Sequence, residues 1–207
     1  MQSPSDRPGD HDVLLVVDVQ RDFCPGGTLA VPDGDAIVPV VNRLAQGFAH
    51  VILTQDWHPA GHSSFASAHP GSQPFETVEM EYGSQILWPD HCVQGTPGAA
   101  FHPALDVPRA ELVVRKGFRP LIDSYSAFQE NDRKTLTGLA GYLRERGFER
   151  VTLCGIATDV CVFYSALDAR AAGFAATLVV DACAGLDHDG SLARAFDDMR
   201  AAGVALV

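Results

Sequence analysis

The sequence lacks long apolar runs. None reaches the roughly 18 residues that a transmembrane helix needs. Residues 1–12 are polar and contain Pro and Gly, whereas a secretory signal peptide is basic and then apolar. We therefore expect a soluble protein of the cytoplasm that makes no membrane contact.

Basic side chains are also few. Lys and Arg number 15 against 26 Asp and Glu, which gives a formal net charge of -11, and the basic residues are scattered singly along the chain. A nucleic-acid-binding face needs clustered positive charge. These counts argue against a nucleic-acid partner.

Paired cysteine motifs are absent as well. The five cysteines lie at irregular spacings, at positions 24, 92, 154, 161 and 183, with no Cys-x-x-Cys. An odd number of irregularly spaced thiols is typical of reduced cysteines in a cytosol. We expect no disulfide framework.

The sequence does contain a regular alternation of strand and helix patterns. Six apolar stretches are predicted to be strands: residues 13–17, 50–54, 110–115, 150–154, 176–180 and 204–207. Strands that alternate with helices predict a mainly parallel sheet with helices on both faces, a three-layer α/β/α fold. With 207 residues and 46% hydrophobic content, the chain is expected to form one domain, 1–207, in which residues 1–11 are a loose tail.

The helices are predicted from apolar periodicity and from glycines. One helix is expected over residues 35–47, and a second on an apolar face that starts at Leu136 and continues through Leu139, Ala140 and Leu143. Three glycines each precede a predicted strand and are expected to end a helix: Gly147, Gly173 and Gly203.

Four chemically active side chains directly follow predicted strands: Asp18, Asp56, Lys116 and Cys161. The carboxyl ends of parallel strands lie at one edge of a sheet, where ligands bind in open α/β folds. We expect the four side chains to meet at that edge. A single acid or lysine at a strand end is usually a solvated group, so the prediction depends on all four together.

Cys161 lies where the strand at 150–154 turns into a helix, for which Thr158 and Asp159 offer N-cap oxygens. In the first helical turn, free N–H groups and the positive end of the helix dipole favour a nucleophilic thiolate. The backbone N–H groups of Ala157 and Cys161 are placed to form an oxyanion hole. The alternative is a small buried cysteine without a catalytic role.

Asp56 and His58 are two residues apart, so in extended backbone their side chains point to the same side, as a metal-binding pair requires. His91 lies further on, in a loop bounded by Pro89. One carboxylate and two imidazoles with open positions suit one divalent metal ion, with zinc as the first choice and manganese or iron as alternatives. The other interpretation is a set of incidental surface polar groups.

With these residues in view, the sequence resembles the isochorismatase-like cysteine hydrolases and, within them, the nicotinamidase/pyrazinamidase family. The resemblance covers nearly the whole chain. Its landmarks are residues 17–23 (VDVQRDF), 55–59 (QDWHP), 88–98 (WPDHCVQGTPG), 116–117 (KG) and 155–162 (GIATDVCV).

The resemblance implies three groups of site residues: a catalytic triad, Asp18, Lys116 and Cys161; a metal set, Asp56, His58 and His91; and a substrate-ring pocket, Phe23 and Trp88. It also implies a cis peptide bond between Ile156 and Ala157. His62 is a candidate for a further ligand, but its interval from His58 differs from that in mycobacterial-type enzymes. We leave His62 out of the metal set and expect it to support a ligand or the structure.

The reaction implied by the resemblance is hydrolysis of nicotinamide to nicotinate and ammonia in NAD salvage, with pyrazinamide as a second substrate. Asp18 would take the thiol proton while Lys116 holds the charged pair, and Cys161 would attack the carboxamide carbon to give a thioester. The metal would hold the pyridine nitrogen, and Phe23 and Trp88 would hold the faces of the ring.

Three other functions remain open. Another member of the superfamily, such as a carbamoyl-amide hydrolase or an isochorismatase, would not need the Asp-x-His chelate. A metallohydrolase would activate water with the metal and leave Cys161 a bystander. A nucleotide-binding module fits the fold alone, but no Gly-x-Gly-x-x-Gly follows the first strand. The expected partner is a small aromatic amide, and a homo-oligomer is compatible with the sequence.

Overall fold

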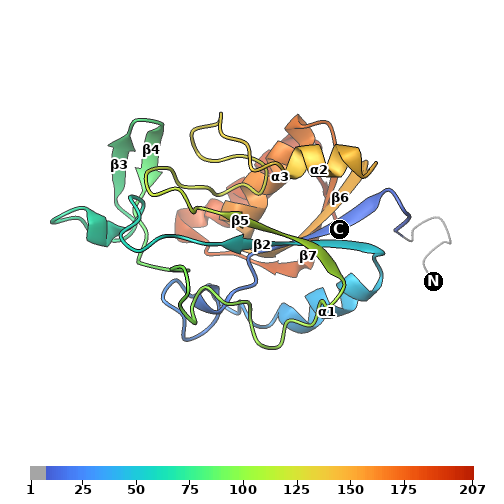
Figure 1. The fold of residues 1–207 in the computed structure, drawn as a ribbon, viewed down its shortest axis with the longest axis horizontal. Helices are drawn as coiled ribbons and strands as arrows, with labels where there is room; N and C mark the ends of the chain where they lie inside the picture. The colour runs from blue at the N-terminus through green and yellow to red at the C-terminus, as the bar shows by residue number, and fades with distance from the viewer. Residues whose placement is uncertain (1–7) are drawn as a thin grey trace.

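The computed structural model describes residues 8–207, and its centre is a six-stranded sheet with strand order β5-β2-β1-β6-β7-β8 (Figure 1). All neighbouring strands in it are parallel. The strands are β1 (Asp12–Val17), β2 (His50–Asp56), β5 (Ala110–Lys116), β6 (Arg150–Ile156), β7 (Ala175–Ala184) and β8 (Ala205–Leu206). The six predicted strands and the parallel α/β fold are confirmed.

Helices cover both faces of the sheet (Figure 1). Helix α1 (Val38–Gln46) packs on one face, and α2 (Leu139–Glu145), α3 (Phe163–Ala171) and α4 (Ser191–Ala201) pack on the other. The buried strand β1 packs against the helices on both faces of the sheet, because its successive side chains point alternately into the two apolar cores. Among residues 8–207, no helix is long and apolar enough to cross a membrane.

Two helices begin later than the sequence pattern predicts. Helix α1 starts at Val38, with Pro39 in its first turn, where a missing N–H costs no hydrogen bond. The predicted apolar face of α2 is wrong at Leu136, which lies before the helix and is 70% exposed. Gly138 separates Leu136 from the helix, because its φ of 95° is left-handed and cannot continue a right-handed turn.

The three glycines predicted to end helices do so. Gly147, Gly173 and Gly203 have φ values of 74°, 94° and 79°. These left-handed values are the ones that a C′ residue adopts, and glycine adopts them without steric cost.

An antiparallel hairpin was not predicted. Strands β3 (Thr77–Met80) and β4 (Gly83–Ile86) pair outside the main sheet. The hairpin has only a partly buried face, so it lacks the continuous apolar run by which the other strands were found. Of the expected N-terminal tail, residues 1–7 lie outside the described residues, and residues 10–11 form the turn that enters β1.

The central strands β1 and β6 approach closely at the end that carries the site. Val17 pairs with Gly155, and a Cβ atom added to Gly155 would lie 2.0 Å from the carbonyl oxygen of Val17. Gly155 also has a φ of 121°, which L side chains rarely adopt. Glycine at this position therefore lets the strand that leads to Asp18 lie directly beside the strand that leads to Cys161.

Candidate active site

The carboxyl ends of β1, β2, β5 and β6 bring Asp18, Asp56, Lys116 and Cys161 together. The Nζ atom of Lys116 lies 2.8 Å from Oδ2 of Asp18, 3.1 Å from Oδ1 of Asp56 and 3.4 Å from Sγ of Cys161. It also donates a hydrogen bond to the carbonyl oxygen of Ser124 at 3.1 Å. A single buried ammonium thus contacts all three of the other side chains that the sequence predicted at this edge.

Asp18 is fixed by a residue of the neighbouring strand. Its backbone turns away from β1 with a φ of 47°, and its side chain is fully buried. The hydroxyl of Thr54 donates to Oδ1 of Asp18 at 2.6 Å and accepts from the Asp18 N–H at 3.1 Å. Thr54 therefore orients one carboxylate oxygen and leaves Oδ2 facing Lys116.

Burial and charge pairing act in opposite directions on Asp18 and Lys116. Burial alone would lower the pKa of Lys116, but the carboxylates of Asp18 and Asp56 outweigh it and hold that pKa well above its ordinary value. Burial is the largest influence on Asp18 and raises its pKa, while Lys116 offsets part of the rise. The lysine therefore stays charged, and the carboxylate is a stronger proton acceptor than an exposed aspartate.

Cys161 lies in a π-helical turn, Thr158–Val162, that precedes α3, and the Ile156–Ala157 peptide bond before the turn is cis. Burial raises the pKa of the Cys161 thiol well above its ordinary value, although Lys116 acts to lower it. This direction opposes the predicted stabilisation of a thiolate by a helix N-terminus. A thiol in these surroundings would need a base to act as a nucleophile.

The predicted helix caps are also wrong. Neither Thr158 nor Asp159 caps a helix with its side chain. The carboxylate of Asp159 instead accepts hydrogen bonds from the N–H groups of Leu186 and Asp187, at 2.9 Å each, and from the hydroxyl of Ser191. These bonds join the turn that carries Cys161 to the segment that follows β7.

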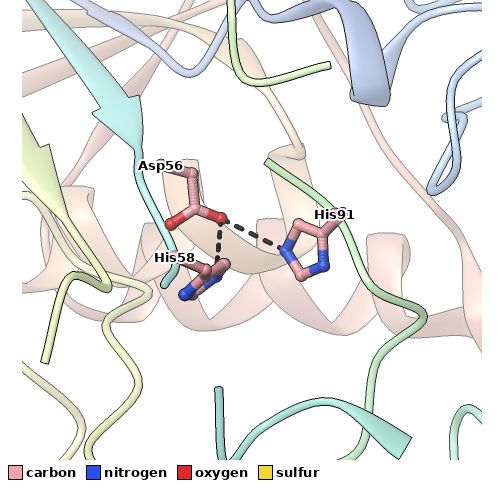
Figure 2. Close-up of side chains that lie close together, drawn as sticks. All are labelled: Asp56, His58 and His91. Atoms are coloured by element: carbon pink, nitrogen blue, oxygen red, sulfur yellow. Dashed lines mark ion pairs between the residues drawn. The ribbon is translucent and has the colours of Figure 1, made fainter. Parts of the chain in front are cut away.

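Asp56, His58 and His91 lie close together, and one carboxylate oxygen of Asp56 faces both rings (Figure 2). Oδ2 of Asp56 is 3.2 Å from Nε2 of His58 and 3.2 Å from Nε2 of His91. The Nδ1 atoms face backbone carbonyls, of Gly117 for His58 and of Pro89 for His91, at 2.8 Å each. An imidazole that donates from Nδ1 keeps a lone pair on Nε2, so all three ligand atoms are suited to one metal ion.

His62, His58 and Asp123 form a second cluster of possible ligand atoms. Both ring nitrogens of His62 are engaged, however. Nδ1 accepts the N–H of Ser64 at 3.1 Å, and Nε2 donates to the carbonyl of Arg119 at 2.8 Å. A ring with both nitrogens hydrogen-bonded has no free lone pair, which agrees with the supporting role expected of His62.

A pocket opens over Cys161 and over the three possible metal ligands, Asp56, His58 and His91, with about 370 Å³ of empty space including its mouth. Phe23 and Trp88, the two residues that the resemblance assigns to a substrate pocket, both line it together with Tyr125. Aromatic and apolar walls with a few polar groups at the base are typical of a site for a small ring compound.

The backbone at the base of the pocket offers hydrogen-bond donors. Ala157 and Cys161 both line the pocket, and within residues 8–207 the N–H of Ala157 has no acceptor. A free N–H beside a thiol is suited to a developing oxyanion.

The comparison with known proteins agrees with this geometry. The model of the isochorismatase domain matches residues 12–207. The chain belongs to the isochorismatase family. Among its relatives, the nicotinamidase of Acinetobacter baylyi is 56% identical over 198 residues, which cover 96% of this chain and 92% of that protein.

Two solved structures extend the similarity of this isochorismatase-family protein. A nicotinamidase/pyrazinamidase of Acinetobacter baumanii has a TM-score of 0.95 and 56% identity, over 96% of each chain. A pyrazinamidase of Pyrococcus horikoshii, in complex with zinc, has a TM-score of 0.79 and 38% identity, over 95% of this chain and 98% of that chain. The protein is thus an amidohydrolase of the nicotinamidase/pyrazinamidase family, and the family expected from the landmarks is confirmed.

Three residues of the isochorismatase-family site were not found from the sequence. Thr54 is the partner of Asp18, and Gln85 of the hairpin donates from Nε2 to the hydroxyl of Tyr125 at 2.8 Å. That hydroxyl also accepts from Nε1 of Trp88 at 3.2 Å, so Tyr125 fixes the pocket wall. The polar and aromatic loop at 124–128 was the available signal for Tyr125, whereas Thr54 and Gln85 carry none without the fold.

Proposed function

We propose that the protein hydrolyses nicotinamide to nicotinate and ammonia, and pyrazinamide to pyrazinoate, with Cys161 as nucleophile. The observation that carries the proposal is the position of the Lys116 ammonium, which contacts Asp18, Asp56 and Cys161 at once. The names of the Acinetobacter relatives, nicotinamidase and pyrazinamidase, support the same substrates.

In the first half-reaction, Oδ2 of Asp18 takes the proton of the Cys161 thiol, and Sγ forms a bond to the carboxamide carbon. The carbonyl oxygen becomes an oxyanion that the N–H groups of Ala157 and Cys161 stabilise. As the oxyanion collapses, the C–N bond breaks and the proton held by Asp18 passes to the leaving nitrogen. Ammonia departs, and a thioester remains.

In the second half-reaction, a water molecule gives a proton to Asp18 and attacks the thioester carbon. The C–S bond then breaks, the proton held by Asp18 returns to Sγ of Cys161, and the carboxylic acid is released and loses its own proton to solvent. Lys116 stays positively charged throughout, because the Asp56 carboxylate remains ionised beside it even while Asp18 carries the proton. Its positive charge stabilises the Asp18 carboxylate and the Cys161 thiolate that forms transiently, and holds both side chains beside it.

We further propose that Asp56, His58 and His91 hold one divalent ion, with zinc as the first choice. Their three ligand atoms converge, and each histidine has the tautomer that frees Nε2. The zinc in the Pyrococcus relative supports this choice. A bound ion would act as a Lewis acid that holds a pyridine or pyrazine nitrogen, while Phe23 and Trp88 hold the ring from its sides.

Replacement of the nucleophile tests the mechanism. Cys161→Ala should abolish ammonia release from nicotinamide, because no covalent intermediate can form, while calorimetry should still detect nicotinamide binding. Cys154→Ala is the matched control, because Cys154 is also buried but does not line the pocket. Turnover by Cys161→Ala within tenfold of the wild type would instead support a metal-activated water as the nucleophile.

The assignment has two consequences for the biology of the chain. Nicotinate is the product that NAD salvage uses, and a thiol nucleophile must stay reduced, so we place the enzyme in cytoplasmic NAD salvage. We also propose that residues 1–207 form a single hydrolase domain, since the family model extends from residue 12 to the last residue.

A further inference from the structure

Strand β2 continues beyond the point where β1 stops pairing with it. The β1–β2 ladder ends at Val16 and Leu53, whereas β2 extends to the proposed metal ligand Asp56. On its other side, Asp56 still pairs with Lys116 of β5. The edge of Asp56 that faces β1 therefore needs other hydrogen-bond partners, since buried backbone groups are rarely left without one.

The side chain of Gln20 supplies both missing partners. Its Oε1 accepts the N–H of Asp56 at 2.7 Å, and its Nε2 donates to the carbonyl oxygen of Asp56 at 2.9 Å. Gln20 is fully buried. Its carboxamide thus holds the main chain of Asp56 as a neighbouring strand would.

The same carboxamide reaches the segment that follows His91. The second hydrogen of Nε2 is donated to the carbonyl oxygen of Ala99 at 2.9 Å. That segment also pairs with His58, which follows β2, because the N–H of His58 donates to the carbonyl of Cys92 at 3.0 Å. The Gln20 side chain therefore connects the two stretches of chain that carry the ligand atoms.

We propose that Gln20 is a positioning residue of the metal centre, which sets the main chain of Asp56 relative to the segment that carries His91. This inference rests on the proposed metal set. Gln20 contacts neither the ligand atoms nor the pocket, so it acts on the metal only through the backbone that it holds.

The chemistry of the side chain is specific to this role. A carboxamide has one acceptor and two donors in the required plane, and all three functions are used here. A glutamate could accept from Asp56 N–H, but it could donate at most one hydrogen bond to the two carbonyl oxygens. A methionine of similar size could make none of the three bonds.

The test compares Gln20→Met with a matched variant, Gln55→Met. Gln55 is also buried, and its Nε2 donates to the same Ala99 oxygen at 3.0 Å, but its side chain does not hold Asp56. Zinc affinity of the full chain would be measured by competition with a chromophoric chelator, and folding of the metal-free chain by near-ultraviolet circular dichroism. We expect Gln20→Met to weaken zinc binding by roughly 10 to 100 fold, as is usual when the support of a metal ligand is lost, and Gln55→Met to stay within threefold of the wild type.

The outcomes separate this inference from the proposed function. If the wild-type protein binds no zinc, the metal set itself is wrong. If the wild type binds zinc and folded Gln20→Met binds it equally well, or Gln55→Met weakens binding as much, the positioning role is wrong. Should Gln20→Met not fold, Gln20→Glu keeps the acceptor for Asp56 N–H and should show the same loss; failure of both variants to fold would assign Gln20 to general stability instead.

Discussion

The hydroxyl of Thr54 should control the pH at which the enzyme loses activity in acid. Thr54 donates to Oδ1 of Asp18 at 2.6 Å, a bond that stabilises the ionised carboxylate and lowers its pKa. Thr54→Val keeps the shape of the side chain and removes the donor. In the proposed mechanism Asp18 must be ionised to take the thiol proton, so its pKa should define the acid limb of the kcat/KM profile.

The size of the shift follows from the bond that is lost. A hydrogen bond to a charged group contributes about 1.5–3 kcal/mol, and one pKa unit corresponds to about 1.4 kcal/mol. Loss of the bond should therefore raise the pKa of Asp18 by about 1 to 2 units. The ion pair with Lys116, at 2.8 Å, remains in the variant, so the lower end of that range is expected.

The assay is ammonia release from nicotinamide, measured as kcat/KM against pH. The acid limb of Thr54→Val should move to higher pH, while Thr54→Ser, which keeps a hydroxyl, should follow the wild-type profile. Thermal unfolding of each variant shows whether the buried substitution has disturbed the fold. An acid limb that stays in place in folded Thr54→Val would refute the assignment of Asp18 as the base that Thr54 orients.

Two further predictions concern the metal group and the stability of the fold. In Gly117→Ala, the new Cβ atom would lie 2.4 Å from Cε1 of His58, and residue 117 has a φ of 67° that alanine rarely adopts. Because His58 would have to move, the zinc that stays bound after gel filtration should fall at least tenfold. A zinc content equal to that of the wild type would contradict the reasoning. At the far end of the sheet, the Arg150 hydrogen bonds hold the pKa of Asp12 below its ordinary value, so their stabilisation is present above about pH 4 and is lost as the pH falls through the lowered value. Since Arg150 is half exposed, Arg150→Met should lower the free energy of unfolding by less than about 1 kcal/mol at pH 7 in urea titrations, and this difference should shrink as the pH is lowered below about 4; a loss that persists undiminished in acid would point to packing instead.

The fold could be predicted from the sequence because its strands are buried on both faces. Five consecutive apolar residues at 13–17 form a run of the length and character of a strand covered on both faces, and each is at most 1% exposed. The helix boundaries were harder to predict from the sequence, because periodicity alone does not show that Gly138 adopts a left-handed conformation between Leu136 and α2. The β3–β4 hairpin was not predicted, because its partly exposed strands contain no continuous apolar run.

The site could be predicted only as far as sheet topology extends. Asp18, Asp56 and Lys116 each lie at or just beyond the carboxyl end of a parallel strand. Because such ends share one edge of a sheet, the sequence alone predicted that these side chains would lie close together. The raised pKa of Cys161 was not predictable, because it depends on burial by segments distant in the sequence. The partners of the site side chains, such as Thr54 for Asp18, likewise depend on which strands are neighbours.

The contact between β1 and β6 has a consequence for how this protein tolerates substitution near its site. A methyl group at position 155 would meet the carbonyl oxygen of Val17 at 2.0 Å, so the sheet would have to widen at that point. Asp18 follows Val17 directly, and Cys161 lies in the turn that follows β6, so the widening would separate the two side chains that we propose exchange a proton. A misplacement of about 1 Å can cost roughly 100-fold in rate. The hydrogen atom that Gly155 carries in place of a methyl group therefore sets the spacing between the two strands, and with it the spacing of Asp18 and Cys161.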